Sequence, residues 1–311
     1  MKKLIAILCA VCLLASCAAG TGSTDAPGST SQADTYTFTD ALGRSVTVAN
    51  PQRVAALSGS FAETWMLAGG NVACVTQDAF TERQLALPES VVNAGSLKTP
   101  SAEVLIDAVV DFVLLSAGID GQLALENTLT AAGIPCAYFA VETFDEYLAM
   151  LQICTDITGR TDLYAENGTT LQAQINSAVQ STAGKPAPTV LLLRAYSGGV
   201  KAKNSDNMTG KMLQDLGCIN IADTDDALLE DLSLEKILAA DPDFIFITTM
   251  GANEEALATL ADTLESSPAW STLRAVQENR CIVLEQALFH YKPNNRWGES
   301  YEKLAAYLYQ S

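Results

Sequence analysis

The chain has 311 residues, of which 36 are acidic and 18 are basic, so its formal net charge is -18 at pH 7. This negative balance excludes a nucleic-acid-binding protein, which needs a basic face. The length is sufficient for two modest lobes, each with buried apolar residues.

The first residues, "MKKLIAILCAVCLLASCAAG", have the pattern of an export signal. Two lysines precede an apolar run that ends at Ala15 and is too short for a permanent membrane helix. The run closes in "LASC", which resembles the lipobox of bacterial lipoproteins, where the signal is cleaved before an acylated cysteine. We expect residues 1–17 to be a lipoprotein signal, with lipid on Cys17 anchoring the protein to the outer face of the cell membrane. The alternative is an ordinary signal peptide with an incidental cysteine.

Residues 18–35 are small, polar and rich in Gly, Ser and Thr, and this composition predicts a flexible tether. The folded part should start at residue 36. Beyond Cys17, the mature chain would hold five cysteines, none of them in a CxxC or metal-ligand spacing. Most lie in apolar segments, which favours buried thiols, although an exported protein can also form a disulfide.

Short apolar runs separated by helical stretches predict buried parallel strands with crossover connections. An alternating stretch around Gly43 predicts a hairpin before them. The predicted strands are residues 54–57, 72–75, 112–115, 136–139, 190–193, 244–248 and 281–284.

Two segments repeat one pattern: "SAEVLIDAVVDFVLLS" at residues 101–116 and "SLEKILAADPDFIFIT" at residues 233–248. In each copy a serine is a plausible N-cap, and a glutamate two residues later suits the start of a helix. A short helix then leads into a buried strand. The repeat predicts two lobes that are built alike.

A helix of about twenty residues is expected between the lobes, within residues 160–185. Tyr164, Leu171, Ile175 and Val179 recur at helical spacing on one face. Gly184 and the prolines after it end the pattern. We therefore expect an N-terminal lobe over residues 36–158, a connecting helix over 159–185 and a C-terminal lobe over 186–311.

Residues 36–311 resemble the cluster III substrate-binding proteins of ABC importers. The resemblance is carried by "FTDALGRSVTVANPQRVAALSGSFAETWMLAGG", the two repeats, "AAGIPCAYF", "LQDLGCINIAD", "SPAWSTLRAVQENRCIVLE" and "RWGESYEKLAAYLY" in this order. It implies an α/β fold of two Rossmann-like lobes with mainly parallel sheets, joined by one long backbone helix with the ligand between them. It also implies an iron-siderophore or similar metal chelate as the transported ligand, with haem or cobalamin as alternatives, and a permease and an ATPase as partners.

In this family, one glutamate per lobe at the repeated motif meets arginines of the permease, which assigns that role to Glu103 and Glu235. The simpler reading of both is favourable charge at a helix start. The resemblance implies no permanently bound cofactor, and we expect a monomer.

The ligand should sit beyond the carboxyl ends of the strands of both lobes. Residues that follow predicted strands, together with one lysine before the first repeat, are the candidate ligand-binding set, each with the alternative of a solvated loop residue. Basic and aromatic groups among them suit an anionic, partly aromatic chelate. The set is Ser58, Phe61, Gln77, Lys98, Ser116, Arg194, Tyr196, Lys201, His290 and Tyr291.

The stretch "LFHYKPNNRWG" at residues 288–298 contains the only histidine of the chain. Some haem-binding members of the family coordinate iron through Met, His or Tyr, so His290 and Tyr291 are candidate axial ligands. Lining of the cleft without metal contact, or capping of the last helix, are the other interpretations.

The sequence contains no GxSxG, HExxH or P-loop spacing, and the histidine has no identifiable nucleophilic partner, so we predict that the protein is not an enzyme. A function of another class is also compatible with the lobes: a surface lipoprotein for adhesion or metal-centre maturation.

Overall fold

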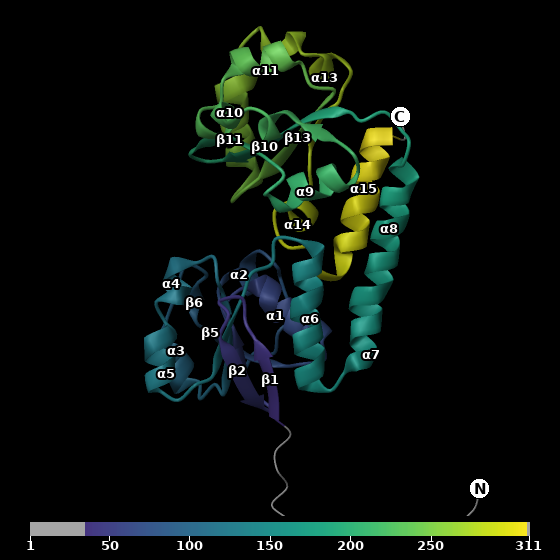
Figure 1. The fold of residues 1–311 in the computed structure, drawn as a ribbon. Helices are drawn as coiled ribbons and strands as arrows, with labels where there is room; N and C mark the ends of the chain where they lie inside the picture. The colour runs from purple at the N-terminus through teal and green to yellow at the C-terminus, as the bar shows by residue number, and fades with distance from the viewer. Residues whose placement is uncertain (1–34, 310–311) are drawn as a thin grey trace, which may run out of the picture. The chain divides into compact units, whose positions relative to one another are not determined.

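The computed structural model describes residues 35–309 (Figure 1). Cys17, the predicted signal and the predicted tether up to residue 34 lie outside the described residues. Within residues 35–309, none of the helices has the length and apolar character that crossing a membrane requires.

The N-terminal lobe is built on a five-stranded parallel sheet of order β5-β4-β3-β8-β9. The predicted hairpin precedes it as the antiparallel pair β1 (Thr35–Thr39) and β2 (Ser45–Ala49), which turns at Gly43 with a φ of 75°. The sheet strands are β3 (Val54–Ala56), β4 (Val72–Val75), β5 (Val92–Asn93), β8 (Phe112–Ser116) and β9 (Cys136–Phe139), with a small antiparallel pair, β6 (Gly95–Ser96) and β7 (Thr99–Pro100), beside it. The helices are α1 (Gly59–Leu67), α2 (Asp78–Thr81), α3 (Ala102–Asp107), α4 (Asp120–Leu123), α5 (Glu126–Ala131) and α6 (Phe144–Thr158).

The C-terminal lobe has a second sheet of order β11-β10-β13-β14, in which β12 also pairs with β10. All pairs are parallel except β10 with β11. The mixed α/β fold with mainly parallel sheets is therefore confirmed. The strands are β10 (Thr189–Tyr196), β11 (Gly199–Lys203), β12 (Ile219–Asn220), β13 (Phe244–Thr249) and β14 (Cys281–Val283); the helices are α9 (Met208–Asp215), α10 (Asp226–Glu230), α11 (Leu234–Ala240), α12 (Asn253–Leu260), α13 (Arg274–Gln277) and α14 (Gln286–Phe289).

The two repeated segments form the same unit in both lobes, α3 leading to β8 and α11 leading to β13. Ser101 Oγ accepts a hydrogen bond from the Val104 amide at 3.3 Å, and Ser233 Oγ accepts one from the Lys236 amide at 3.4 Å. Both serines are thus the predicted N-caps.

The expected helix between the lobes runs from Thr161 to Thr182 as α7 (Thr161–Tyr164), a π-helical turn (Ala165–Thr169) and α8 (Thr170–Thr182). Leu171 and Ile175 are buried on its inner face. The last helix, α15 (Trp297–Tyr309), packs along α8 (Figure 1). A Cβ on Gly298 would overlap the Gln174 side chain, so glycine allows the two helices to approach this closely.

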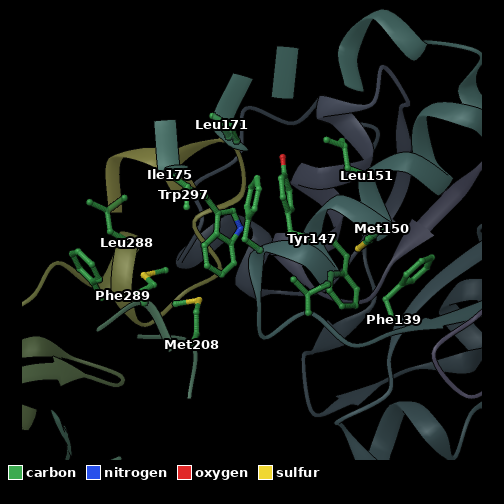
Figure 2. Packing of buried hydrophobic residues seen from close by; sticks show 14 of the residues in the cluster. Phe139, Tyr147, Met150, Leu151, Leu171, Ile175, Met208, Leu288, Phe289 and Trp297 are labelled. Atoms are coloured by element: carbon green, nitrogen blue, oxygen red, sulfur yellow. The ribbon is translucent and has the colours of Figure 1, made fainter. Parts of the chain in front are cut away.

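One continuous apolar core connects both lobes. It contains residues of the N-terminal sheet such as Phe112, of the C-terminal sheet such as Phe246, and of α6, α8 and α15 between them. Figure 2 shows Trp297 between Tyr147 on one side and Leu288 and Phe289 on the other. Each sheet also has a smaller cluster of buried apolar residues on its other face, one cluster in each lobe. The predicted lobe boundaries at residues 158 and 186 stay a prediction, since packing continues across them.

The five cysteines of the described residues are free thiols, four of them buried. Burial raises the pKa of Cys74 to about 11 and of Cys218 to about 12. Such thiols are protonated at neutral pH and unreactive, in agreement with the expected structural role.

Candidate ligand-binding cleft

A cavity of about 470 Å³ lies where the strands of the N-terminal sheet end and the segment after α14 crosses above them. Its volume is within the range of sites for small molecules. The carboxyl ends of parallel strands meet at one edge of a sheet, so the loops after β3, β4, β8 and β9 line the same space. The lining residues are Ser58, Ser60, Phe61, Asp78, Glu82, Arg83, Leu97, Ser116, Ala117, Gly118, Ile119, Ala140, Val141, Glu142, His290, Tyr291 and Lys292.

Helix α1 starts directly at the cavity because of a glycine. A Cβ on Gly59 would lie 2.9 Å from the Cα and N of Ala79, closer than such atoms approach in proteins. Glycine therefore lets the first turn of α1 rest against α2. Asp78 Oδ2 accepts a hydrogen bond from the Gly59 amide at 2.7 Å, which places a carboxylate at the N-terminus of α1.

Half of the candidate residues from the sequence line this cavity: Ser58, Phe61, Ser116, His290 and Tyr291. Two others from the same lobe do not. Gln77 is exposed, and its side-chain oxygen accepts a hydrogen bond from Asn93. Lys98 is also exposed and is not among the lining residues. Gln77 was a candidate because it follows a predicted strand, and Lys98 because it precedes the first repeat. Neither position in the sequence was enough to place the side chain in the cavity.

The remaining three candidates, Arg194, Tyr196 and Lys201, are on a β-hairpin. The predicted strand ends at residue 193, whereas β10 continues to Tyr196 and turns into the antiparallel strand β11, so Arg194 and Tyr196 are within a strand. Arg194 and Lys201 are register partners. A Cβ on Gly198 would lie 2.9 Å from the Tyr196 ring, so glycine at this position makes room for the ring.

The hairpin carries three cations without a counter-ion. Arg194, Lys201 and Lys203 form no ion pair with any residue of the described range 35–309. Burial and the neighbouring charges of Arg194 and Lys201 lower the pKa of Lys203. The Arg194 Nε is buried and has no hydrogen-bond partner in the described part of the chain. In a chain of net charge -18, this is an uncompensated positive site.

The hairpin does not line the cavity, but its charge reaches the cavity wall. Burial lowers the pKa of Arg194, and the charge of Glu142 opposes this shift. The charge of Arg194 in turn acts on His290. Both Glu142 and His290 line the cavity, so the charge of Arg194 acts on this wall.

His290 is a neutral imidazole at pH 7. Burial lowers its pKa to about 4, assisted by the charges of Arg194 and Lys292. Its Nδ1 is buried and has no hydrogen-bond partner among the residues that the structure describes. Its ring centroid lies 5.0 Å from that of Tyr291. Among residues 35–309, no group of three or more His, Cys, Asp or Glu side chains is arranged to hold a metal ion. A metal bound by His290 would therefore need most of its ligands from a chelator.

The segment from His290 to Asn294, which we call the strap, is fastened to the N-terminal lobe. Arg83 Nη1 donates to the Lys292 carbonyl at 2.7 Å, and Asn294 Nδ2 donates to the Ser60 carbonyl at 2.9 Å. Lys292 Nζ also pairs with Glu142 at 2.7 Å. His290 and Tyr291 follow the last strand of the C-terminal lobe, but these bonds hold them to the N-terminal lobe.

Sequence reasoning missed the charged part of the lining. Asp78 comes one position after Gln77, where the candidate set stopped, and α2 then brings Glu82 and Arg83 to the same wall. These residues could have been found by extending the candidate set from the end of strand β4 through the helical turn that follows it. Glu142 similarly follows β9, and Lys292 is part of the stretch already quoted.

The sequence profile of the periplasmic binding proteins matches residues 54–288, and the chain belongs to this family. No curated protein matches the chain. Among solved structures, it is similar to the siderophore-binding protein BauB, with a TM-score of 0.71 and 17% identity over 88% of this chain and 99% of BauB. The haem-binding protein RhuT of Roseiflexus has a TM-score of 0.67 and 21% identity over 83% of this chain and 98% of RhuT. The petrobactin-binding protein YclQ of Bacillus subtilis has a TM-score of 0.69 and 17% identity over 88% of this chain and 97% of YclQ.

These similarities confirm the family and the two-lobed fold that the sequence predicts. Membership in the periplasmic binding proteins also gives the protein a location outside the cytoplasm and a ligand-binding role.

Proposed function

We propose that the protein is the substrate-binding component of an ABC importer and captures a ferric siderophore or a similar anionic metal chelate. The observation that carries this proposal is a cavity of about 470 Å³ whose wall residues Glu142 and His290 feel the charge of Arg194. Arg194 belongs to a hairpin that also carries Lys201 and Lys203. Arg and Lys bind the acidic groups of such chelates by charge-assisted hydrogen bonds. The structural relatives support this class of ligand, since one was solved with acinetobactin and ferric iron and another binds petrobactin.

The cavity is suited to bind without a large rearrangement. Phe61 and Tyr291 offer aromatic surface for the less polar part of a chelate. The continuous core and the strap oppose a large movement of the lobes, so affinity should come from a largely preformed site. Similar scattering profiles with and without ligand would support this, and a large shrinkage would contradict it.

The test of the anion site is a triple variant, Arg194→Met, Lys201→Met and Lys203→Met. We expect its affinity for the ferric chelate that binds the wild type most tightly to fall about 100-fold, since several charge-assisted bonds are lost. Titration calorimetry with ferric citrate, a ferric catecholate and haem would measure this. The control is Lys236→Met, which removes a cation that is paired with Asp225. Equal affinities of the triple variant and the wild type would contradict the proposal.

Haem is the second candidate ligand, and a corrinoid is a third. Haem is favoured by one observation: His290 is a neutral imidazole that lines the cavity beside Tyr291. Protein purified from haem-supplied cells should then show a Soret band that shifts in His290→Ala. An unchanged band in this variant would exclude His290 as an iron ligand.

Delivery to the permease would use Glu103 and Glu235. Both are exposed, stand at equivalent positions of α3 and α11, and form no ion pair within the described part of the chain. Paired acids at the start of these helices suit docking to a permease with two-fold symmetry, where such charges set orientation and encounter rate. Glu103→Arg with Glu235→Arg should abolish uptake by cells without changing ligand affinity; unchanged uptake would exclude the docking role.

The chelate is cargo, and we propose neither a permanently bound cofactor nor catalysis. The protein would work as a monomer, tethered through lipid on Cys17. The function of another class, a surface lipoprotein for adhesion or metal-centre maturation, would be favoured if no permease and ATPase genes lie beside this gene.

A further inference from the structure

The cavity wall on the N-terminal lobe has the opposite charge to the hairpin. Asp78 and Glu82 both line the cavity. The cation next to them in sequence, Arg83, is already engaged by Glu63 and by the Lys292 carbonyl. Neither Asp78 nor Glu82 forms an ion pair with a residue in the range 35–309.

Asp78 has one oxygen that the fold uses and one that it leaves unused. Oδ2 accepts the hydrogen bond from the Gly59 amide, which accounts for the residue as a favourable charge at the start of α1. Oδ1 accepts no hydrogen bond from any residue in the range 35–309, although Asp78 is only 8% exposed. A buried carboxylate oxygen without a hydrogen-bond donor costs free energy. The capping of α1 by Oδ2 therefore does not explain why Oδ1 is buried here.

Glu82 and Tyr291 belong to the same part of the cavity as Asp78. Burial and the charge of Asp78 raise the pKa of Glu82. Burial, and the charges of Glu82 and Asp78, raise the pKa of Tyr291 against the opposing charge of Arg83. The carboxylate of Asp78 already occupies the N-terminus of α1, so this end of the cavity repels anions. The acidic groups of a ligand would therefore face the hairpin, and a different group must face Asp78 and Glu82.

We propose that Asp78 and Glu82 form a subsite for a protonated amine of the transported chelate. This inference rests on the proposed function and specifies its ligand further: a metal chelate with acidic groups at one end and an ammonium group at the other. A bare metal ion fits less well, because no three His, Cys, Asp or Glu side chains come together among residues 35–309. An ammonium group supplies donors to two carboxylates and replaces the missing counter-charge.

The test uses matched pairs of ferric chelates: a hydroxamate, a catecholate and an α-hydroxycarboxylate, each prepared with a free amine and with the amine acetylated. The wild type should bind the amine form of at least one pair about tenfold more tightly than its acetylated form. Asp78→Asn and Glu82→Gln should each remove most of this preference, so that the ratio of the two affinities approaches one. The Asn amide oxygen can still accept from Gly59, so the start of α1 is retained. Glu89→Gln, an exposed change outside the cavity, is the control for net charge.

The outcomes separate the subsite from the function on which it rests. Equal binding of the amine and acetylated forms, or a preference that persists in both variants, would overturn the subsite and leave the chelate-binding function intact. Failure of the wild type to bind any of the six chelates, or haem, would overturn the proposed function and the subsite with it.

Discussion

The two lobes contain the same helix-strand unit but differ in what has been added to it. In the N-terminal lobe, α3 leads to β8 in a sheet that is parallel throughout, and the loops at the strand ends form the cavity. In the C-terminal lobe, α11 leads to β13, and an antiparallel hairpin with three unpaired cations extends the sheet. The repeated unit supplies two similar scaffolds, whereas the difference in charge between the acidic wall and the basic hairpin lies in the additions.

The largest expected effect tests whether the two lobes are one folding unit. Trp297 is 1% exposed in the core that both lobes share. Trp297→Ala should lower the free energy of unfolding by about 3–5 kcal/mol, and hydrogen exchange should accelerate in β8 and β13 together. Glu302→Ala, an exposed change on the same helix, should stay within about 0.5 kcal/mol of the wild type. Faster exchange in one sheet alone would show that the lobes unfold separately.

The second prediction concerns the pH dependence of stability that follows from the lowered pKa of His290. His290 lines the cavity of the N-terminal lobe, and its pKa also depends on the charge of Arg194 on the hairpin of the C-terminal lobe. Its pKa is about 4 in the folded protein, against 6.5 for an ordinary histidine. Between these values the unfolded chain binds a proton that the folded protein does not. The group therefore lowers stability as pH falls through this window, by up to about 1.4 kcal/mol per pH unit, and has no such effect above it.

His290→Gln should remove this dependence, and the difference between the urea unfolding curves of the two proteins at several pH values measures it. The chain has a single histidine, so one imidazole NMR signal also reports the pKa directly. Burial is the main cause of the shift, with Arg194 second, so Arg194→Met should raise the pKa only in part. Parallel pH profiles of the wild type and His290→Gln would contradict the prediction.

The smallest expected effect sharpens the likeness of the two repeats. Ser101→Ala and Ser233→Ala each remove an N-cap hydrogen bond of nearly the same length. Each should lower the free energy of unfolding by about 1 kcal/mol, and Ser→Asp at either position should preserve it. Chemical unfolding of the four variants measures this. If only one serine mattered, the two units would not be equivalent in energy.

Elements whose formation depends on local sequence were predictable. The apolar runs at residues 72–75 and 136–139 match β4 and β9 residue for residue. Strands of a parallel sheet covered on both faces are apolar along their length, as in the fully buried β9. Strand β11 could not be predicted in the same way. It is short, and Gly198 just before it together with Gly199 at its first position suggests a loop.

The site itself was only half predictable, because side-chain direction depends on contacts between distant residues. Gln77 and Asp78 are neighbours after the same strand, yet Asp78 faces the cavity while Gln77 bonds to Asn93. The strap is a stronger example. Asn294 is held by Ser60 and Glu63, which are more than two hundred residues earlier in the chain, and no local pattern reports such a contact.

The continuous core has a consequence for the timing of folding. The Trp297 ring at the start of α15 packs against Phe144 of α6 with ring centroids 5.8 Å apart, so the apolar surface of the first lobe is not fully covered until α15 has been synthesised. An incomplete nascent chain would lack a finished core throughout translation. This order of events favours a chain that reaches an export machinery still unfolded and acquires its native packing only after transfer.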